Sequence, residues 1–278
     1  MNATLPPTLR SLTKLSQWFS AHGGWIHPAL TFGHSPLYSC RGIVSTEDIP
    51  TTESAFGKQA VILLPTALEV TDAVANDGLS GRLSSSSLQA LQANGWLLAT
   101  FLAFERRRSA SFWQPYLETI PARPSAGWSL RTQDAAHALR QLGSLGQGCK
   151  AHIKARHKQY DMAAQKHARQ FGKALGLNAS DLLWGLGTVH SRAYVGQDAH
   201  RMFPMIDLCN HSQHAANVEG IRLLNDATYV RATIRHQGQP ATLPAGHELL
   251  LDYGPRETYP NPCDCFSNYG FIPEEYNV

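Results

Sequence analysis

Three short segments, in a fixed order, constrain this chain more than any other feature. The first is RMFPMIDLCNHS at 201–212, where an apolar run containing a proline and an aspartate ends in Asn210–His211. The second is GHELLLDYG at 246–254, a strand-like apolar run that ends in Tyr253–Gly254. The third is NYGF at 268–271, a second Tyr-Gly pair. An Asn-His pair alone would indicate little, but the ordered set of three restricts what the chain can fold into.

Composition sets the broad class. The 278 residues fit one large domain or two small ones, and 43% hydrophobic against 16% charged residues allow a real core. A net charge of +3 is mildly basic and does not require nucleic acid as a partner. Five cysteines are an odd number without a framework spacing, which favours free thiols and a reducing compartment.

Targeting signals are weak. No apolar run reaches membrane-spanning length, and the N-terminus lacks the charged and apolar regions of a secretion signal. Arg10 and Lys14 precede any acidic residue, which leaves a plastid transit peptide open. We therefore expect a cytoplasmic or nuclear protein, with a plastid location as the alternative.

Periodicity predicts strands, then a helical block, then strands. A helix is expected over Leu9–Phe19 and closes at Gly23–Gly24. Strands are expected at 41–45, 59–64, 218–224, 229–234 and 248–252, with a hairpin turn at Asn225–Asp226. In the middle we expect a loop at 76–87, one helix at 88–107, a packed irregular segment at 111–121, a helical stretch at 134–175 interrupted around 143–148, and a helix capped by Ser180 that runs to Tyr194.

The three segments resemble the C-terminal half of a SET domain, most closely in the branch typified by the Rubisco large-subunit methyltransferases. The resemblance extends to GGWIHPAL at 23–30, SFWQPYL at 111–117 and WGLGTVHSRAY at 184–194. It implies an α+β fold of small sheets with a pseudoknot and a helical insertion. We expect one SET domain over 1–278, with 76–190 as the mainly helical insertion. The helical substrate-binding domain that follows SET in that branch is absent from this sequence.

The resemblance also implies an activity. Members of the branch transfer a methyl group from S-adenosylmethionine to a protein side chain, most often lysine and in some cases histidine. A protein substrate and a monomer are expected, without a membrane. A non-catalytic SET-like module that binds a peptide is the alternative from another class. Methyl transfer from a sulfonium is an in-line displacement, so positioning and electrostatics suffice and no metal is needed.

The cofactor residues that the resemblance implies come from three segments. Asn210 and His211 would hold the amino-acid end of the cofactor, because an amide offers a donor and an acceptor to a zwitterion. Arg192 would pair with its carboxylate, although an exposed helix-end arginine is an equal alternative. Ser39 and Arg41 align with the N-terminal cofactor loop. Without the flanking motifs, Asn210 would be read as a turn cap and His211 as a core histidine.

The remaining site residues concern chemistry and substrate. Tyr253 is the expected catalytic residue, because its phenol oxygen can orient the amine and accept contacts from the methyl hydrogens. Tyr194 and Asp207 are expected beside the substrate. Tyr269 and Phe271 match a second aromatic cluster that walls the lysine channel, although aromatic residues in such a position are often core.

The sequence departs from the family pattern at three places and contains two signals that point to other functions. Cys40 replaces a glycine of the cofactor loop, His247 stands where an acid is common beside Glu248, and the loop 255–267 is longer than usual. Cys263 and Cys265 suggest zinc, but the further cysteine pair that such a site needs is missing, so no metal is expected. The basic stretch 150–173 could bind an acidic partner, although a solvated helix face is the simpler interpretation.

Overall fold

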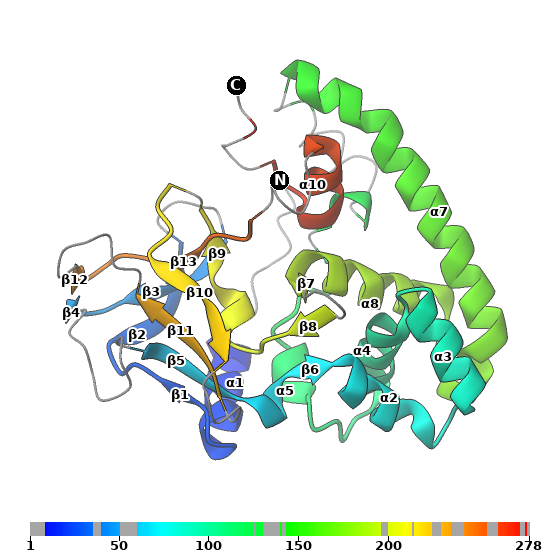
Figure 1. Cartoon of the computed structure of the whole chain (residues 1–278), viewed down its shortest axis with the longest axis horizontal. Helices are drawn as coiled ribbons and strands as arrows, with labels where there is room; N and C mark the ends of the chain where they lie inside the picture. Colours follow the sequence, from blue (N-terminus) through cyan, green and yellow to red (C-terminus); the bar gives the residue numbers. More distant parts are fainter. Residues whose placement is uncertain are drawn as a thin grey trace. The chain divides into compact units, whose positions relative to one another are not determined.

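The structure is a computed structural model that describes residues 9–35, 40–50, 60–124, 126–129, 140, 143–195, 200–212, 214–223, 229–234, 242–254, 261–272 and 276. The chain divides into two compact units (Figure 1). The sheet unit comprises Pro6–Glu69 and Phe203–Pro255. The helical unit comprises Met1–Leu5, Val70–Met202 and Arg256–Val278. Each unit is therefore built from segments that are distant in the sequence.

The sheet unit begins with a helix and continues in short strands. Its elements are α1 (Leu9–Ala21), β1 (Trp25–Ile26), β2 (Leu30–His34), β3 (Arg41–Ser45), β4 (Ile49–Pro50), β5 (Ala60–Pro65), β9 (Asn210–His211), β10 (Val218–Leu223), β11 (Tyr229–Ile234), β12 (Thr242–Leu243) and β13 (Leu250–Leu251). The main sheet has the order β1-β5-β11-β10-β13-β9, and β2-β3 and β12-β4 form two small ribbons. The apolar face of α1 is buried, as its periodicity predicts, through Leu12, Leu15, Trp18 and Phe19.

Two parallel pairings bring distant segments of the sheet unit together. β13 pairs in parallel with β9, with Leu250 opposite Asn210 and Leu251 opposite His211. On its other side β13 pairs in parallel with β10. Parallel neighbours need a long connection, and the antiparallel β10–β11 pair lies in the chain between β9 and β13. The predicted hairpin strands are thus confirmed, while the turn Asn225–Asp226 lies outside the described residues.

The helical unit contains most of the helices. Its elements are β6 (Val70–Thr71), α2 (Asp72–Ser80), α3 (Ser85–Ala93), α4 (Leu97–Arg107), α5 (Gln114–Leu117), the 3₁₀ turn η2 (Gly127–Ser129), α7 (Gly143–Leu175), α8 (Ala179–Arg192), β7 (Tyr194–Val195), β8 (His200–Met202) and α10 (Pro262–Tyr269). α4 and α8 pack closely, because a Cβ on Gly185 would lie 2.0 Å from the carbonyl oxygen of Ala99. β6, β8 and β7 form a small sheet. The mixed α+β class predicted from the sequence is confirmed. Within the described residues, no helix is long and apolar enough to cross a membrane.

Two expectations for residues 76–107 are wrong. The segment 76–87 is not a loop, because α2 covers its first part and α3 begins at Ser85. Each helix has a polar cap: Thr71, which precedes α2, accepts from the backbone N–H of Val74, and Ser84, within the segment, accepts from that of Ser87. The helix expected over 88–107 is two helices, α3 and α4, which are separated where Gly95 takes a φ of +72°.

Three further helix boundaries also differ from expectation. Asn178, not Ser180, caps α8, in a capping box with Asp181. α7 begins at Gly143, which has a φ of +59°, and then runs without a break through Gly148, so within the described residues the interruption expected around 143–148 is limited to Gly143. The expected loop 255–267 contains the start of α10, whose first turn has Asn261 as its cap and Pro262 at the first helical position.

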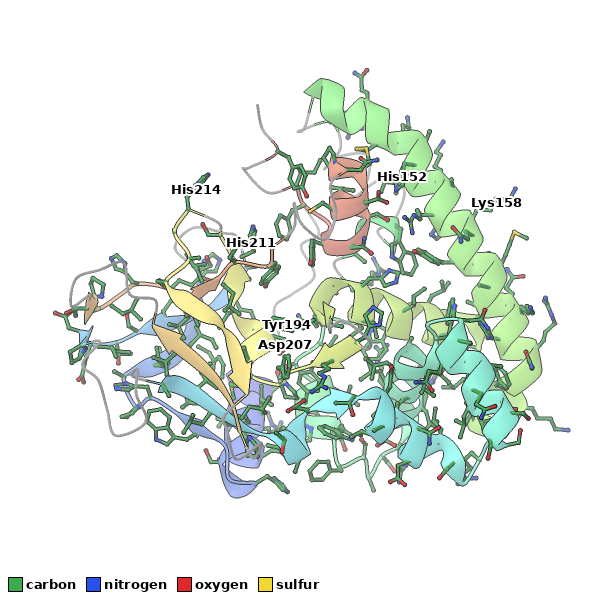
Figure 2. The ribbon with its side chains drawn as sticks, viewed as in Figure 1. His152, Lys158, Tyr194, Asp207, His211 and His214 are labelled. Carbon is green, nitrogen blue, oxygen red and sulfur yellow. A yellow bond between two sulfur atoms is a disulfide. The ribbon has the colours of Figure 1, made fainter. Side chains whose placement is uncertain are left out.

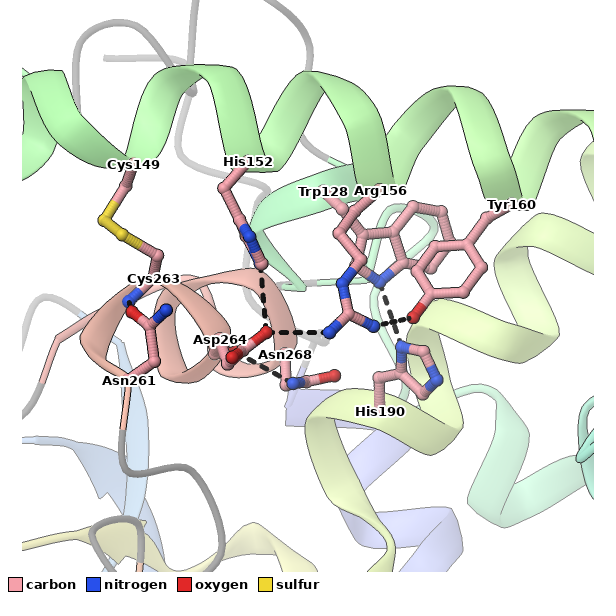
Figure 3. Close-up of polar contacts among 10 residues, drawn as sticks. All are labelled: Trp128, Cys149, His152, Arg156, Tyr160, His190, Asn261, Cys263, Asp264 and Asn268. Carbon is pink, nitrogen blue, oxygen red and sulfur yellow. Dashed lines mark hydrogen bonds and ion pairs between the residues drawn. A yellow bond between two sulfur atoms is a disulfide. The ribbon is translucent and has the colours of Figure 1, made fainter.

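The expectation that all five cysteines are free thiols is wrong. Cys149 on α7 and Cys263 on α10 form a disulfide, with their Cα atoms 5.0 Å apart (Figure 3). Cys40, Cys209 and Cys265 are free. Spacing could not reveal the pair, because its two members are 114 residues apart. The cysteine count therefore no longer supports a reducing compartment.

Candidate functional site

The parallel β9–β13 pair places His211 beside Tyr253. The two ring centroids are 5.0 Å apart, and the backbone N–H of Tyr253 donates to Nδ1 of His211 over 3.1 Å. That nitrogen also lies 3.2 Å from the carbonyl oxygen of Leu251. A backbone N–H can only donate, so Nδ1 acts as the acceptor, and the proton of the neutral ring sits on Nε2. His211 is buried, and the backbone N–H of Tyr253 holds its ring.

The hydroxyl of Tyr253 has a defined orientation. It donates its proton to the carbonyl oxygen of Cys209 over 2.6 Å. A phenol has one proton to give, so its oxygen serves any further group as an acceptor. The side chain is partly buried at the end of β13. The tyrosine oxygen is therefore held at the backbone of Cys209, the residue before Asn210. Its lone pairs remain available to contact an amine N–H or polarised methyl hydrogens.

Asn210 belongs to a buried polar cluster that links β9 to β3. Its Nδ2 donates to the carbonyl oxygen of Arg41 over 2.8 Å and to Oε1 of Glu248 over 2.5 Å. Ser35 donates to the other oxygen of Glu248, and Glu248 is only 3% exposed. A Cβ on Gly42 would lie 2.1 Å from Oε1 of Glu248, so any other residue at this position of β3 would displace the carboxylate from its present place. Both amide protons of Asn210 are therefore used, and its Oδ1 is the atom suited to a donor such as an ammonium.

Glu248 belongs to the candidate site, although the sequence predicts no role for it beyond an acid beside His247. It contacts Asn210, Ser35 and Gly42 and so links the segments that carry them. The sequence feature that could have indicated a role for Glu248 is its position within the second motif, 246–254. What the sequence could not indicate is that β3 passes directly over it, since that contact joins segments about 200 residues apart.

The segment between Phe203 and Asn210 is tightly turned and buried. Met205 has a φ of +80° and is the one non-glycine residue in the described part of the chain with a positive φ. Asp207 follows in the 3₁₀ turn η3 (Ile206–Leu208), and its backbone N–H donates to the carbonyl oxygen of Phe203 over 2.9 Å. Asp207 is 8% exposed. Non-glycine residues in this region of backbone space are strained and concentrate at functional sites, which agrees with a site that depends on this turn.

Two cysteines border the cluster. Burial, followed by the charges of Asp207 and Glu248, raises the pKa of the Cys209 thiol well above its ordinary value. Cys40 is exposed by its accessible surface, yet atoms packed near its sulfur desolvate it. That desolvation and the charge of Glu248 raise the pKa of the Cys40 thiol. Both thiols are therefore neutral near pH 7 and are poor nucleophiles.

The other expected site residues belong to the helical unit. Arg192 ends α8 and Tyr194 begins β7, and both are partly buried. Tyr269 ends α10, and Gly270 with a φ of +80° is the C-cap of the helix. The ring centroids of Tyr269 and Phe271 are 5.9 Å apart. The structure thus brings Arg41, Asp207, Asn210, His211 and Tyr253 together in the sheet unit (Figure 2 labels Asp207 and His211). Ser39 lies outside the described residues, and so do residues 255–260.

Metal ligands are not clustered in the described part of the chain. No group of three or more His, Cys, Asp or Glu side chains there is arranged to hold a metal ion. Of the Cys-x-Cys pair, Cys263 is engaged in the disulfide and Cys265 is buried.

No known family model matches the sequence, and no curated protein sequence matches it. Solved structures do match. The fold is that of a SET domain, as the sequence resemblance predicts. The SET domain of LSMT bound to lysine and AdoHcy matches 96% of this chain with a TM-score of 0.69 at 16% identity. Rubisco LSMT bound to sinefungin and monomethyllysine matches 94% with a TM-score of 0.67 at 17% identity. This chain spans 58% and 56% of those two chains.

Proposed function

We propose that this protein is an S-adenosylmethionine-dependent methyltransferase that acts on a lysine side chain of a protein. The observation that carries the proposal is the parallel β9–β13 pair, which sets Asn210 and His211 against Tyr253 within a SET fold. Structural neighbours bound to AdoHcy with lysine, and to AdoMet, support both the cofactor and the acceptor.

The described residues fit such a cofactor. Oδ1 of Asn210 can accept from an ammonium, since the two amide protons are held by Arg41 and Glu248. The carboxylate of Glu248 adds negative charge close by, which also favours a cationic ligand. Bound S-adenosylmethionine would supply an electrophilic methyl group on a sulfonium. Arg192, Tyr194, Tyr269 and Phe271 are proposed to complete the cofactor and substrate pockets, as the family resemblance implies.

The proposed role of Tyr253 follows from its hydrogen bond. Because the hydroxyl donates to Cys209, its oxygen can accept from the incoming amine and orient the amine lone pair towards the methyl carbon. The amine must be neutral to attack, and an apolar aromatic channel lowers the pKa of a lysine by desolvation. A histidine acceptor would need the same orientation of a neutral nitrogen.

One experiment tests the proposal. Purified protein is titrated with S-adenosylmethionine by calorimetry, and a host extract is then incubated with methyl-labelled cofactor with and without the enzyme. We expect micromolar binding and an enzyme-dependent labelled protein band whose label maps to lysine. Absence of cofactor binding would favour the non-catalytic peptide-binding module, which Cys40 in the cofactor loop motivates. Label on histidine would change the acceptor and leave the reaction class intact.

A further inference from the structure

α7 concentrates the positive charge of this protein. It contains seven of the chain's 24 Lys and Arg residues and one of its 21 acidic residues, Asp161. The helix therefore has a net charge of +6. Because the whole chain has +3, all other residues together sum to −3. The excess of positive charge is a property of one helix and not of the surface in general.

One cation of α7 points towards the rest of the helical unit, and the other six lie on the exposed side of the helix. Arg156 points inward and donates to Asp264 and to the hydroxyl of Tyr160 (Figure 3). The other six are exposed, and we call them the basic face: Lys150, Lys154, Lys158, Lys166, Arg169 and Lys173. At 3.6 residues per turn they span an arc of ~160° and a length of ~35 Å. Figure 2 shows Lys158 on the outer side of α7 and His152 on the side of α10.

The cations of the basic face have no acidic partners among the described residues. None of its six side chains makes an ion pair there, whereas exposed cations elsewhere in the helical unit do. Arg107 pairs with Asp181, and Arg108 pairs with Glu105. Lys150, Lys154 and Lys158 follow one another at i, i+4, a spacing at which like charges destabilise a helix. Packing does not require this arrangement, because the core side of α7 is formed by other residues, among them Ile153, Ala164 and Phe171.

We propose that the basic face of α7 docks an acidic surface of the protein substrate. This inference rests on the proposed function and names the chemical class of its substrate. Carboxylates along a partner helix or strand would neutralise the row of charges and steer the encounter. Among its charges the helix presents Met162, which is 62% exposed and offers an apolar contact typical of protein interfaces.

The composition of the face favours protein over nucleic acid or membrane. Five of its six cations are lysines, which lack the bidentate fork that suits phosphate. The two aromatic residues of α7 other than histidine, Tyr160 and Phe171, lie outside the face, so it has no stacking platform for bases. A helix that inserts into a lipid surface needs a broad apolar side, and among the α7 side chains that the structure describes Met162 is the one large exposed hydrophobic residue.

The test uses the full-length protein and a fluorescent 20-residue peptide of alternating Glu and Ala as the probe. Binding is measured by anisotropy at 50, 150 and 500 mM NaCl for the wild type and two triple variants. Lys154→Gln/Lys158→Gln/Lys166→Gln removes three charges, and Lys154→Arg/Lys158→Arg/Lys166→Arg keeps them as the matched control. We expect the glutamine variant to bind at least tenfold more weakly at 50 mM NaCl, with the difference vanishing at 500 mM. The arginine variant should bind within twofold of the wild type.

Two results would overturn the docking surface. One is peptide binding by the glutamine variant within twofold of the wild type at low salt. The other is tighter wild-type binding to a 20-base-pair DNA duplex, or to phosphatidylserine vesicles, that is lost in the same variant. Calorimetry with S-adenosylmethionine on the same samples separates the two hypotheses. A wild type that binds the peptide through α7 but binds no cofactor would retain the acidic-protein surface and refute the methyltransferase.

Discussion

The two units of this molecule hold their polar groups in different ways. Around the candidate site in the sheet unit, side chains bond to the backbone of neighbouring segments: Asn210 to Arg41, Tyr253 to Cys209, and Asn217 to both Glu248 and Leu250. At the contact between α7 and α10 in the helical unit, charged side chains pair with one another across the two helices (Figure 3). There Asp264 accepts from Arg156, Nε2 of His152 lies 3.0 Å from the same carboxylate, and a disulfide lies beside them.

This difference predicts that substitutions at the candidate site change chemistry, whereas changes at the α7–α10 contact change stability. A site held by backbone register keeps its shape when one functional group is removed, so a conservative substitution should affect chemistry more than folding. Where side chains and a disulfide hold two helices together, removal of one of these groups should lower the free energy of unfolding. Four experiments test that contrast.

The largest effect is expected from the disulfide of the helical unit. Reduction of Cys149–Cys263 frees a loop with a sequence separation of 114 residues. The gain in entropy of the unfolded chain then costs about 4–5 kcal/mol of stability. Urea unfolding with and without a dithiol reductant measures it. Cys149→Ser should reproduce the loss without reductant, and Cys40→Ser should not. Identical curves for the wild type with and without reductant would contradict a bond between the two cysteines.

The second effect belongs to the sheet unit and to chemistry. Tyr253→Phe removes the hydroxyl and keeps the ring, so fold and cofactor affinity should survive. If the oxygen acts mainly in the transition state, single-turnover methylation at saturating cofactor should fall tenfold to a thousandfold, which is about 1.4–4 kcal/mol. Tyr160→Phe is the matched control in the helical unit, where the hydroxyl accepts from Arg156. A Tyr253→Phe rate within twofold of the wild type would remove Tyr253 from catalysis.

The third effect separates a ligand contact from a structural one. Asn210→Ala should weaken S-adenosylmethionine binding by about 1–3 kcal/mol, because the ligand loses a buried hydrogen-bond partner. Asn217→Ala is its control, since Asn217 donates to Glu248 and accepts from Leu250 entirely within the sheet unit. Calorimetry should show weaker binding in the first variant alone, and melting temperatures should fall in both. Equal affinities would take Asn210 out of the cofactor site.

The fourth effect is the pH response of the helical unit, which amounts to about 2 kcal/mol between pH 7 and pH 5. Burial, with contributions from His200 and Arg156, lowers the pKa of His190 from 6.5 to about 3. Between these values the unfolded chain binds a proton that the folded protein does not. Stability is therefore fully present above pH 6.5 and is lost as the pH falls towards 3, at about 1.4 kcal/mol per pH unit.

Urea midpoints at pH 7, 6 and 5 test this titration. His190→Gln does not titrate and keeps an acceptor for the indole N–H of Trp128, which donates to His190 over 3.0 Å. Its stability should change less with pH than that of the wild type. Equal slopes in the two proteins would mean that His190 does not remain neutral in the folded state.

Local sequence determined the elements whose pattern and packing agree. The apolar period of 9–19 predicts α1, and the β-branched and apolar runs predict β3, β5, β10 and β11, because these signals depend on near neighbours in the chain. The three motifs together predict the SET fold and bring Asn210, His211 and Tyr253 forward as candidates. Polar caps were harder to recognise, since Thr71 and Ser84 lie in stretches with the composition of a loop.

Contacts between distant segments follow from the tertiary structure and could not be read from local sequence. The register of β9 against β13 determines which strand residues face one another, and a shift by one residue would move Asn210 to the other face of the sheet. The approach of Gly42 to Glu248, the positive φ of Met205 and the pairing of Cys149 with Cys263 likewise depend on where separate elements meet. The sequence therefore determined which groups are available for chemistry, and packing decided which of them share a site, because register and close approach are properties of the assembled elements.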